Sequence, residues 1–289
     1  MKFLKTRKKR GYFSKMMLLC YLDGKFVKPE EAQLPMSDLI IQRGVGVFEA
    51  FASFNGRPLM LTPHMERFIA SAKSSEIANI PDVEYMKQVV REGIAKVGRD
   101  VRVRTFLTGG DYFDEEKGCF PEPRFFVIFD DVGLIPAEVK ERGVILEPVS
   151  FGRDNPEVKS INYRATYKMP REAYDILYCP NGEITECGHS NFFLVYDGKI
   201  ITAPLSRVLK GTTRMAVVEL AKQEGYTVEE RCPLWSELTG ATEAFITGSM
   251  KLIVPAVKIG GITIGDGRPG KITRRLSELY VKYMEKWLE

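Results

Sequence analysis

The sequence contains very little histidine: His64 and His189 are the only two among 289 residues. A metal centre built mainly from imidazole ligands needs more of them, so we expect no histidine-based metal cluster and no bound metal. No Gly-x-Ser-x-Gly segment is present, which excludes the hydrolases that present a serine on that turn. Chemistry in this chain must therefore depend on lysine, arginine, glutamate, tyrosine or a bound cofactor.

Paired cysteines and long apolar runs are also missing. The five cysteines are odd in number and include no Cys-x-x-Cys spacing. In a chain of this length they indicate free thiols in a reducing compartment, so the expected location is the cytoplasm. No run of eighteen apolar residues occurs, and we expect no membrane-spanning segment.

Basic residues are concentrated at the start of the chain. The formal net charge is +4, yet residues 1–16 alone carry +7, so the remaining chain carries −3. A mildly acidic body argues against a nucleic-acid partner. We interpret residues 1–16 as a basic N-terminal extension that frays from the fold.

A phosphate-loop motif is nearly present near the end of the chain. The segment 265–271 reads Gly-Asp-Gly-Arg-Pro-Gly-Lys, but Ile272 stands where a metal-binding serine or threonine is required. No buried strand leads directly into this segment, so we interpret it as a loop before the last helix.

Hydrophobic periodicity and turn residues predict a two-domain protein of the α+β (α/β) class. Asp23-Gly24 and Asn55-Gly56 predict hairpins, and Thr62 and Asp82 are the expected N-caps of helices at 63–75 and 83–97. Further strands are expected at 101–108, 124–129, 144–149, 192–196, 199–203, 244–247 and 261–264, and further helices at 165–176, 212–224, 234–239 and 271–288. The polar residues around 130–141 suggest a division into a small N-terminal α/β domain (17–133), a linker (134–141) and a larger C-terminal α/β domain (142–289).

Three segments carry candidate chemistry. Lys159 lies in the otherwise uncharged segment Val158–Tyr163, and burial would make its amine a nucleophile toward a carbonyl. Glu186 lies among small residues before a strand, as expected of a carboxylate presented in a tight turn at a site. Gly211-Thr212-Thr213 opens a predicted helix, where free N–H groups and hydroxyls favour a phosphate.

The order of these three segments resembles the class IV aminotransferases, which are fold-type IV enzymes dependent on pyridoxal 5′-phosphate (PLP). The resemblance extends from about Asp23 to the end of the chain and implies the two-domain, D-amino-acid aminotransferase-like fold. It implies that Lys159 forms the Schiff base and moves a proton between the substrate Cα and the cofactor, from the re face. It also implies a homodimer in which a loop of the second subunit completes the site.

The same resemblance assigns roles to other residues of the site. Glu186 would pair with the pyridine nitrogen, Leu209 would pack on the ring, and Tyr163 would contact the phenolic oxygen. The expected phosphate ligands are Arg67, Thr212, Thr213 and Ser249.

The substrate is less firmly indicated than the cofactor. The Arg-x-His element of the well-known D-amino-acid enzymes is missing, and so is the tyrosine that branched-chain enzymes carry where Arg43 stands. Arg43 and Arg104 instead resemble the carboxylate clamp of a less typical group of D-amino-acid transaminases. His189 is a further candidate for the substrate pocket.

The sequence therefore predicts a ping-pong transaminase that acts on D-amino acids, such as D-alanine or D-glutamate, and 2-oxo acids. A branched-chain L-amino-acid aminotransferase and an aminodeoxychorismate lyase, which eliminates pyruvate, remain open on the same cofactor site. A PLP-binding protein without turnover is a fourth possibility, which the intact Lys159 and Glu186 argue against.

Overall fold

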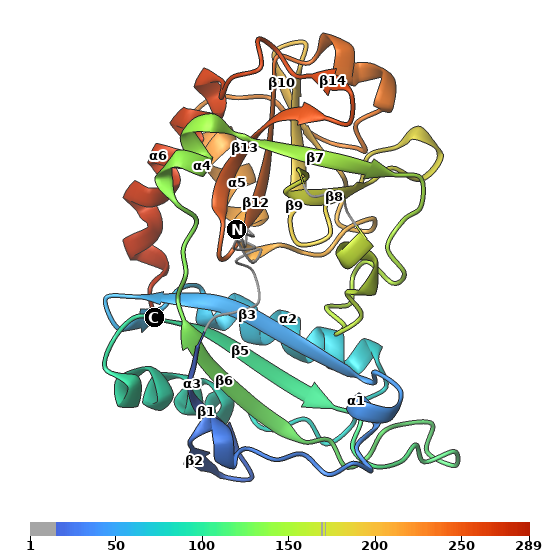
Figure 1. Cartoon of the computed structure of the whole chain (residues 1–289), viewed down its shortest axis with the longest axis vertical. Helices are drawn as coiled ribbons and strands as arrows, with labels where there is room; N and C mark the ends of the chain where they lie inside the picture. Colours follow the sequence, from blue (N-terminus) through green and yellow to red (C-terminus); the bar gives the residue numbers. More distant parts are fainter. Residues whose placement is uncertain (1–15, 169, 171) are drawn as a thin grey trace, which may run out of the picture.

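The computed structural model describes residues 16–168, 170 and 172–289. Two sheets, one above the other in Figure 1, form the two halves of the molecule. The basic extension expected at 1–16 lies outside the described residues, except for Met16. Within the described residues, no helix is both long enough and apolar enough to cross a bilayer.

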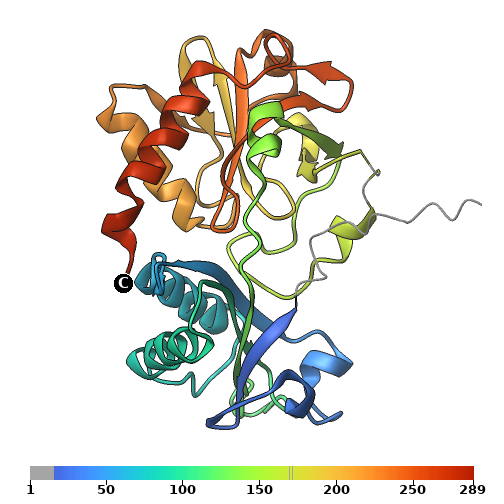
Figure 2. The same cartoon turned by 60° about the vertical axis from the view of Figure 1, so that its left-hand side comes forward.

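The first half is an antiparallel six-stranded sheet in the order β2-β1-β6-β5-β3-β4. Its strands are β1 (Met17–Leu22), β2 (Lys25–Val27), β3 (Gly46–Phe54), β4 (Arg57–Pro58), β5 (Val101–Thr108) and β6 (Phe125–Asp131). A 3₁₀ turn (Pro29–Glu31) and α1 (Leu39–Gln42) precede β3, while α2 (Leu61–Ser74) and α3 (Val83–Val97) cover one face (Figure 2). Phe48, Arg104 and Phe106 lie on the other face, which α2 and α3 do not cover.

The second half is a mixed sheet in the order β11-β10-β9-β12-β13-β7-β8, with β14 paired to β13. Its strands are β7 (Val144–Val149), β8 (Asp175–Tyr178), β9 (Asn191–Tyr196), β10 (Lys199–Thr202), β11 (Val228–Glu230), β12 (Glu243–Gly248), β13 (Leu252–Ile259) and β14 (Ile262–Thr263). The helices are α4 (Ala137–Arg142), α5 (Thr212–Gln223) and α6 (Lys271–Tyr283), with 3₁₀ turns at Arg164–Lys168, Pro180–Gly182, Trp235–Gly240 and Met284–Trp287.

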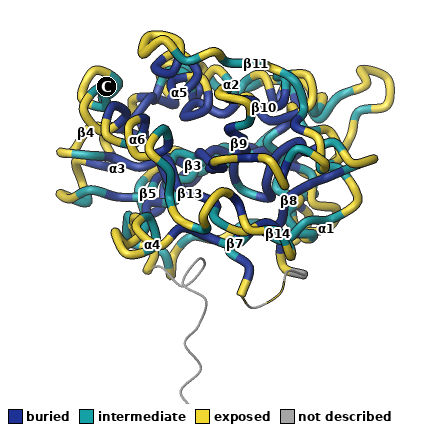
Figure 3. Tube along the Cα trace, turned by 90° about the horizontal axis from the view of Figure 1, so that it is seen from above, coloured by how far each residue is buried: buried dark blue, intermediate teal, exposed yellow. Residues whose placement is uncertain are grey.

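The central strands of the second sheet are apolar on both faces. In β9, Phe193 and Val195 pack in the core that includes α5 and α6, whereas Phe192 and Leu194 pack in a second core on the other face. A strand with both faces covered reads as a continuous apolar run rather than an alternating one, and the strands at the middle of the molecule are drawn as buried in Figure 3. This rigid sheet supports the loops that precede β9 and α5.

Most of the predicted elements are confirmed, and both hairpin turns have the positive φ angles that Asp23-Gly24 and Asn55-Gly56 predicted. Asp82 caps α3 by accepting hydrogen bonds from the N–H groups of Glu84 and Tyr85. The prediction of Thr62 as an N-cap is wrong, because α2 begins at Leu61 and its N-cap is Met60. The carboxylate of Glu289 accepts the N–H of Thr62 instead, a contact between distant segments that local sequence does not reveal.

Three other expectations need correction. The helix expected at 165–176 is a short 3₁₀ turn followed by β8, and Pro170 lies between the two. The segment expected at 234–239 forms a 3₁₀ turn rather than an α-helix, and the last α-helix ends at Tyr283 before a final 3₁₀ turn. α4 (Ala137–Arg142) occupies most of the segment 134–141 that was expected as the linker.

The near phosphate-loop at 265–271 is a loop before α6, as expected. The carboxylate of Glu243 accepts hydrogen bonds from the N–H groups of Ile272 (2.9 Å) and Thr273 (2.8 Å). Because a side chain of the protein already occupies this helix N-terminus, the segment offers no place for a phosphate group.

Candidate active site

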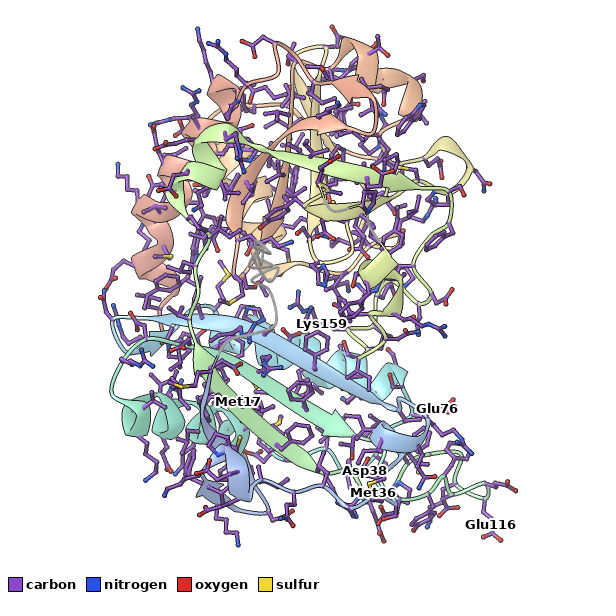
Figure 4. All side chains as sticks on the ribbon, viewed as in Figure 1. Met17, Met36, Asp38, Glu76, Glu116 and Lys159 are labelled. Atoms are coloured by element: carbon purple, nitrogen blue, oxygen red, sulfur yellow. The ribbon has the colours of Figure 1, made fainter. Side chains whose placement is uncertain are left out.

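Lys159 lies where the connection after β7 crosses between the two halves (Figure 4). Its N–H donates to Ser71 Oγ of α2 (3.1 Å), and its carbonyl accepts the N–H of Phe48 in β3 (3.0 Å). Val47 and Ser160 form an antiparallel bridge beside it. The backbone of Lys159 is thus fixed to the first half, independently of what its amine contacts.

The amine of Lys159 lies among aromatic side chains. Nζ is 3.4 Å from the hydroxyl of Tyr163 and 4.7 Å from the centre of the Phe48 ring. Tyr163 packs edge-on against Phe48, with ring centres 5.4 Å apart. The amine is therefore only partly hydrated, as a nucleophilic lysine requires.

Glu186 is a buried carboxyl group with few strong partners. Its Oε2 accepts the N–H of Leu209 (3.2 Å) and is 3.4 Å from the Nδ2 of Asn191. Burial raises the pKa of Glu186 to about 7, although Arg153 and the Leu209 N–H act in the opposite direction. A cationic ring nitrogen beside it would supply a further positive charge and favour the ionised carboxylate.

Arg153 is a residue of the site that sequence reasoning missed. Its Nη1 is 3.4 Å from Glu186 Oε1, its Nη2 donates to the carbonyl of Val158 (3.2 Å), and its guanidinium lies 5.5 Å from the Tyr163 ring centre. It therefore joins the segment of Lys159 to the acid turn. Its place in an irregular loop gives no periodicity by which the sequence could have revealed it.

The N-terminus of α5 is open. Gly211 is the N-cap, no side chain caps the helix, and Thr212 and Thr213 occupy its first two positions. A Cβ at Gly211 would lie 1.9 Å from Asn191 Oδ1, so only glycine permits this close approach. Ser249, after β12, places its hydroxyl 3.3 Å from that of Thr212. We refer to Arg67, Thr212, Thr213 and Ser249 as the phosphate site, because free N–H groups, hydroxyls and a cation favour a dianion there.

Arg67 reaches this place from the first half of the molecule. Its Nη1 donates to the carbonyl of Lys210 (2.8 Å), while Nε and Nη2 each donate to Glu49 of β3 at 2.7 Å. Glu49 also contacts Nδ1 of His64 at 2.7 Å, and the other ring nitrogen of His64 lies 3.2 Å from Thr212 Oγ1. Burial opposes ionisation of Glu49, yet Arg67 and His64 hold its pKa well below the usual range. The sequence indicated Arg67 but not Glu49 or His64.

His189 is held beside Tyr163. Its ring stacks on that of Tyr163 with centres 5.1 Å apart, its backbone N–H donates to Asp175 Oδ2 (3.1 Å), and its ring Nδ1 is 3.2 Å from Asp175 Oδ1. Asp175 is fully buried and also accepts a hydrogen bond from Lys251 at 3.0 Å. His189 is thus close to the Lys159 site, positioned by an acid that the sequence did not single out.

The two arginines expected to bind the substrate have different partners. Arg104 binds the buried carboxylate of Asp130 through Nε (2.7 Å) and Nη2 (3.0 Å), and Arg102 binds the same carboxylate. Arg43 is exposed at the end of α1 and donates to the carbonyl of Gln42 (3.1 Å). In the structure their guanidinium groups do not form a joint clamp.

These features fit PLP. The half-buried amine can react with the aldehyde of PLP, and the Glu186 carboxyl group, whose pKa is raised, can pair with the cationic ring nitrogen. The uncapped N-terminus of α5 can bind the phosphate. Among the described residues there is no cluster of three or more histidine, cysteine, aspartate or glutamate side chains that could hold a metal ion.

Comparison with known families gives the same assignment. The model of the family described as amino-transferase class IV matches residues 46–259. The chain is 34% identical over 281 residues to the "Putative branched-chain-amino-acid aminotransferase" of Methanocaldococcus jannaschii, covering 92% of this chain and 96% of that protein. It is 27% identical over 287 residues to the D-alanine aminotransferase of Staphylococcus haemolyticus, covering 93% and 99%.

Solved structures show the same fold. The branched-chain amino acid aminotransferase of T.th. with pyridoxamine 5′-phosphate superposes with a TM-score of 0.86 at 25% identity, covering 95% of this chain and 98% of the other. The branched-chain aminotransferase of Escherichia coli gives 0.84 at 25% identity, with 95% and 97% covered. The chain therefore has the two-domain fold-type IV arrangement that the sequence predicted.

The pKa of Glu186 gives a test that needs no cofactor. Its proton is bound more tightly in the folded than in the unfolded protein, so the stabilising contribution is complete below about pH 4.5 and is lost as pH rises to about 7. Glu186→Gln removes the group that ionises. We therefore expect the change in the free energy of unfolding caused by this substitution, measured on the cofactor-free protein, to be more stabilising at pH 8 than at pH 4.5 by about 2–3 kcal/mol. Urea unfolding at both pH values measures this difference.

Glu183→Gln is the matched control, because its carboxylate lies on the same turn but is 41% exposed. The control should lack the stability gain at pH 8, because its carboxylate remains in contact with solvent. If the stability change caused by Glu186→Gln were the same at pH 4.5 and pH 8, the assignment of a raised pKa to the buried carboxyl group would be contradicted.

Proposed function

This chain belongs to the class IV aminotransferase family, whose members use PLP, and on that premise we propose that Lys159 is its catalytic residue and Glu186 the partner of the cofactor ring. The observation that carries the proposal is the pairing of a half-buried amine with a buried carboxyl group whose pKa is raised to about 7. The reaction is a ping-pong exchange of an amino group between an amino acid and a 2-oxo acid.

PLP, when bound, supplies an electron-withdrawing ring that makes the α-proton of an amino acid acidic. The amine of Lys159 accepts that proton and returns it during the second half of the reaction. Glu186, ionised by its cationic neighbour, holds the proton on the ring nitrogen, and Arg153 keeps Glu186 oriented toward the Lys159 segment. Arg67, Thr212, Thr213 and Ser249 hold the phosphate, Leu209 packs on the ring, and Tyr163 presents its hydroxyl near the amine.

Branched-chain L-amino acids are the substrate class that we favour. Phe48, beside the Lys159 amine, stacks with Phe106 (ring centres 5.8 Å apart), which in turn stacks with Phe126 (4.7 Å). This aromatic surface suits an apolar side chain. The relatives named as branched-chain aminotransferases, and the occupation of Arg104 by Asp130, support the same choice.

A D-amino-acid transaminase is the second candidate. The side chain of Arg104 is 26% exposed, and D-alanine aminotransferases are among the relatives. In that case Arg43 and Arg104 would bind the α-carboxylate after Arg104 leaves Asp130, which would still be paired with Arg102. A homodimer, with a loop of the second subunit completing the site, remains a prediction for either substrate class.

Replacement of the amine tests the catalytic assignment. Lys159→Ala should lower the rate of amino-group exchange by at least about a thousandfold, because no other described amine lies beside Tyr163 to move the proton. The variant should also lose the visible colour of the holoenzyme. Lys258→Ala, an exposed lysine on β13, is the control and should retain both. A colourless wild-type protein that is unaffected by added PLP would disprove the proposal.

Single half-reactions decide between the substrate classes. The PLP form is mixed separately with L-leucine, D-alanine, D-glutamate and (R)-1-phenylethylamine, and its spectrum is followed. We expect rapid conversion with L-leucine because the aromatic surface accepts its side chain. Conversion by the D-amino acids alone would favour the second candidate.

The carboxylate clamp is examined in the same assay with Arg104→Leu. Arg102→Leu is the matched control, since Arg102 shares the Asp130 carboxylate and the same face of β5. A clamp requires the rate with D-glutamate to fall at least about tenfold in Arg104→Leu alone, the loss expected for one charged hydrogen-bonding partner. Equal rates in the two variants would rule out the clamp.

A further inference from the structure

His64 is a buried histidine that contacts the phosphate site but has no role in the proposed chemistry. Its side chain is 1% exposed and stacks on Phe51 with ring centres 4.8 Å apart. Nδ1 is 2.7 Å from Glu49 Oε2 and 3.3 Å from Arg67 Nη2, while Nε2 is 3.2 Å from Thr212 Oγ1 and 3.1 Å from Ser249 Oγ. One ring nitrogen therefore faces an acid, and the other faces two of the hydroxyls expected to bind phosphate.

The partner of Nδ1 fixes the tautomer of the ring. Glu49 is ionised by Arg67 and can only accept hydrogen bonds. Arg67 Nη2 is farther from Nδ1 (3.3 Å) and already donates to Glu49 at 2.7 Å. The shorter contact with Glu49 therefore assigns the proton to Nδ1 of His64, which donates it to the carboxylate. In a neutral ring, Nε2 then presents a single lone pair to Thr212 and Ser249.

Without an anion, the surroundings favour that neutral ring. Burial lowers the pKa of His64, Glu49 opposes this effect, and the positive charges of Arg67 and Lys159 lower the pKa further. These are the charged groups that face the ring from β3, from α2 and from the Lys159 connection. From the described residues at the N-terminus of α5 and after β12, the side-chain contacts to the ring are the hydroxyls of Thr212 and Ser249.

The neutral ring competes with a phosphate for hydroxyl hydrogens. Thr212 Oγ1 and Ser249 Oγ are 3.3 Å apart and share the one lone pair of Nε2. A hydroxyl that donates to Nε2 cannot donate the same hydrogen to an anion at α5. A ring protonated on Nε2 would instead donate to the hydroxyls and leave both of their hydrogens for the anion.

We propose that His64 takes up one proton from solvent when a phosphate dianion occupies the phosphate site, so that cofactor binding and protonation of this histidine are coupled. One N–H bond forms at Nε2, and the hydroxyls of Thr212 and Ser249 turn toward the anion. The two negative charges of the phosphate outweigh the unfavourable effect of Arg67 and Lys159 on the imidazolium. The inference rests on the proposed phosphate site and makes His64 a positioning residue for it.

Nitrogen NMR of the wild-type protein tests this directly, because the chain contains only two histidines. Protein labelled with ¹⁵N-histidine is observed without cofactor and then saturated with pyridoxamine 5′-phosphate, at about pH 7.5, where a phosphate monoester is mainly a dianion. We expect His64 to change from the neutral tautomer with hydrogen on Nδ1 to a ring with hydrogen on both nitrogens. Pyridoxamine without its phosphate is the control ligand and should leave the ring neutral.

His64→Gln assigns the resonances and supplies a second measurement. Because binding takes up a proton, the affinity of the wild type for pyridoxamine 5′-phosphate should fall by up to about tenfold per pH unit between the lower pKa of the unliganded histidine and the higher pKa of the bound one. In His64→Gln, the part of the pH dependence that comes from protonation of His64 should be absent. If His64→Gln does not fold, the spectrum of His189→Gln identifies the resonances of His64 by elimination. The wild-type spectra then still show whether His64 becomes protonated when the ligand binds.

A ring that stays neutral while the phosphorylated ligand is bound would overturn the inference, and so would a ring already protonated before the ligand is added. Binding itself is monitored by the absorbance of the ligand. Failure of pyridoxamine 5′-phosphate to bind would instead reject the proposed function, and the inference with it.

Discussion

The ion pair between Arg67 and Glu49 is the interaction on which the rest of the site depends. Two donors of Arg67 bind Glu49 at 2.7 Å, and a third binds the carbonyl of Lys210 at 2.8 Å. One guanidinium thus connects β3 and α2 of the first half with the chain that enters α5 in the second. Glu49 is fully buried, so loss of Arg67 would leave its carboxylate without its main counter-charge, which typically costs about 3–5 kcal/mol.

Around this pair the site divides into a fixed frame and an adjustable part. The backbone of Lys159 is bound to β3 and α2, and the acid turn is bound to the entry of α5 through Leu209 and Asn191. The amine, the Glu186 carboxyl group and the hydroxyls near His64 have longer contacts of 3.3–3.4 Å, and we expect them to respond to the charge of a ligand. A cofactor that brings a cationic nitrogen at one end and a dianion at the other satisfies both ends at once.

Much of this site could be predicted from the sequence because its parts lie in short, ordered segments. Lys159, the Glu186 turn and the Gly-Thr-Thr start of α5 each have a local signal, and their order carries the family resemblance. Glu49, His64, Arg153 and Asp175 had no such signal, because their roles come from contacts between segments far apart in the chain. The wrong N-cap at Thr62 has the same cause, since its partner Glu289 lies 227 residues away.

The substrate is the part that the sequence predicts least well. Arg104 was expected to bind the substrate carboxylate together with Arg43, but pairing of strands β5 and β6 places Asp130 beside it. Whether an arginine in a strand is available for substrate depends on its neighbour in space. The aromatic side chains of the same face gave no motif in the sequence, although they form the apolar surface beside Lys159.

A crystal structure of the protein with pyridoxamine 5′-phosphate tests the central claim most directly, because it shows both ends of the cofactor in one measurement. The account predicts that the ring nitrogen lies within hydrogen-bonding distance of Glu186, with the phosphate bound by Arg67, Thr212 and Ser249 and the amine of Lys159 facing the reacting carbon. A cofactor whose phosphate lies elsewhere, or whose ring nitrogen has no contact with Glu186, would contradict it.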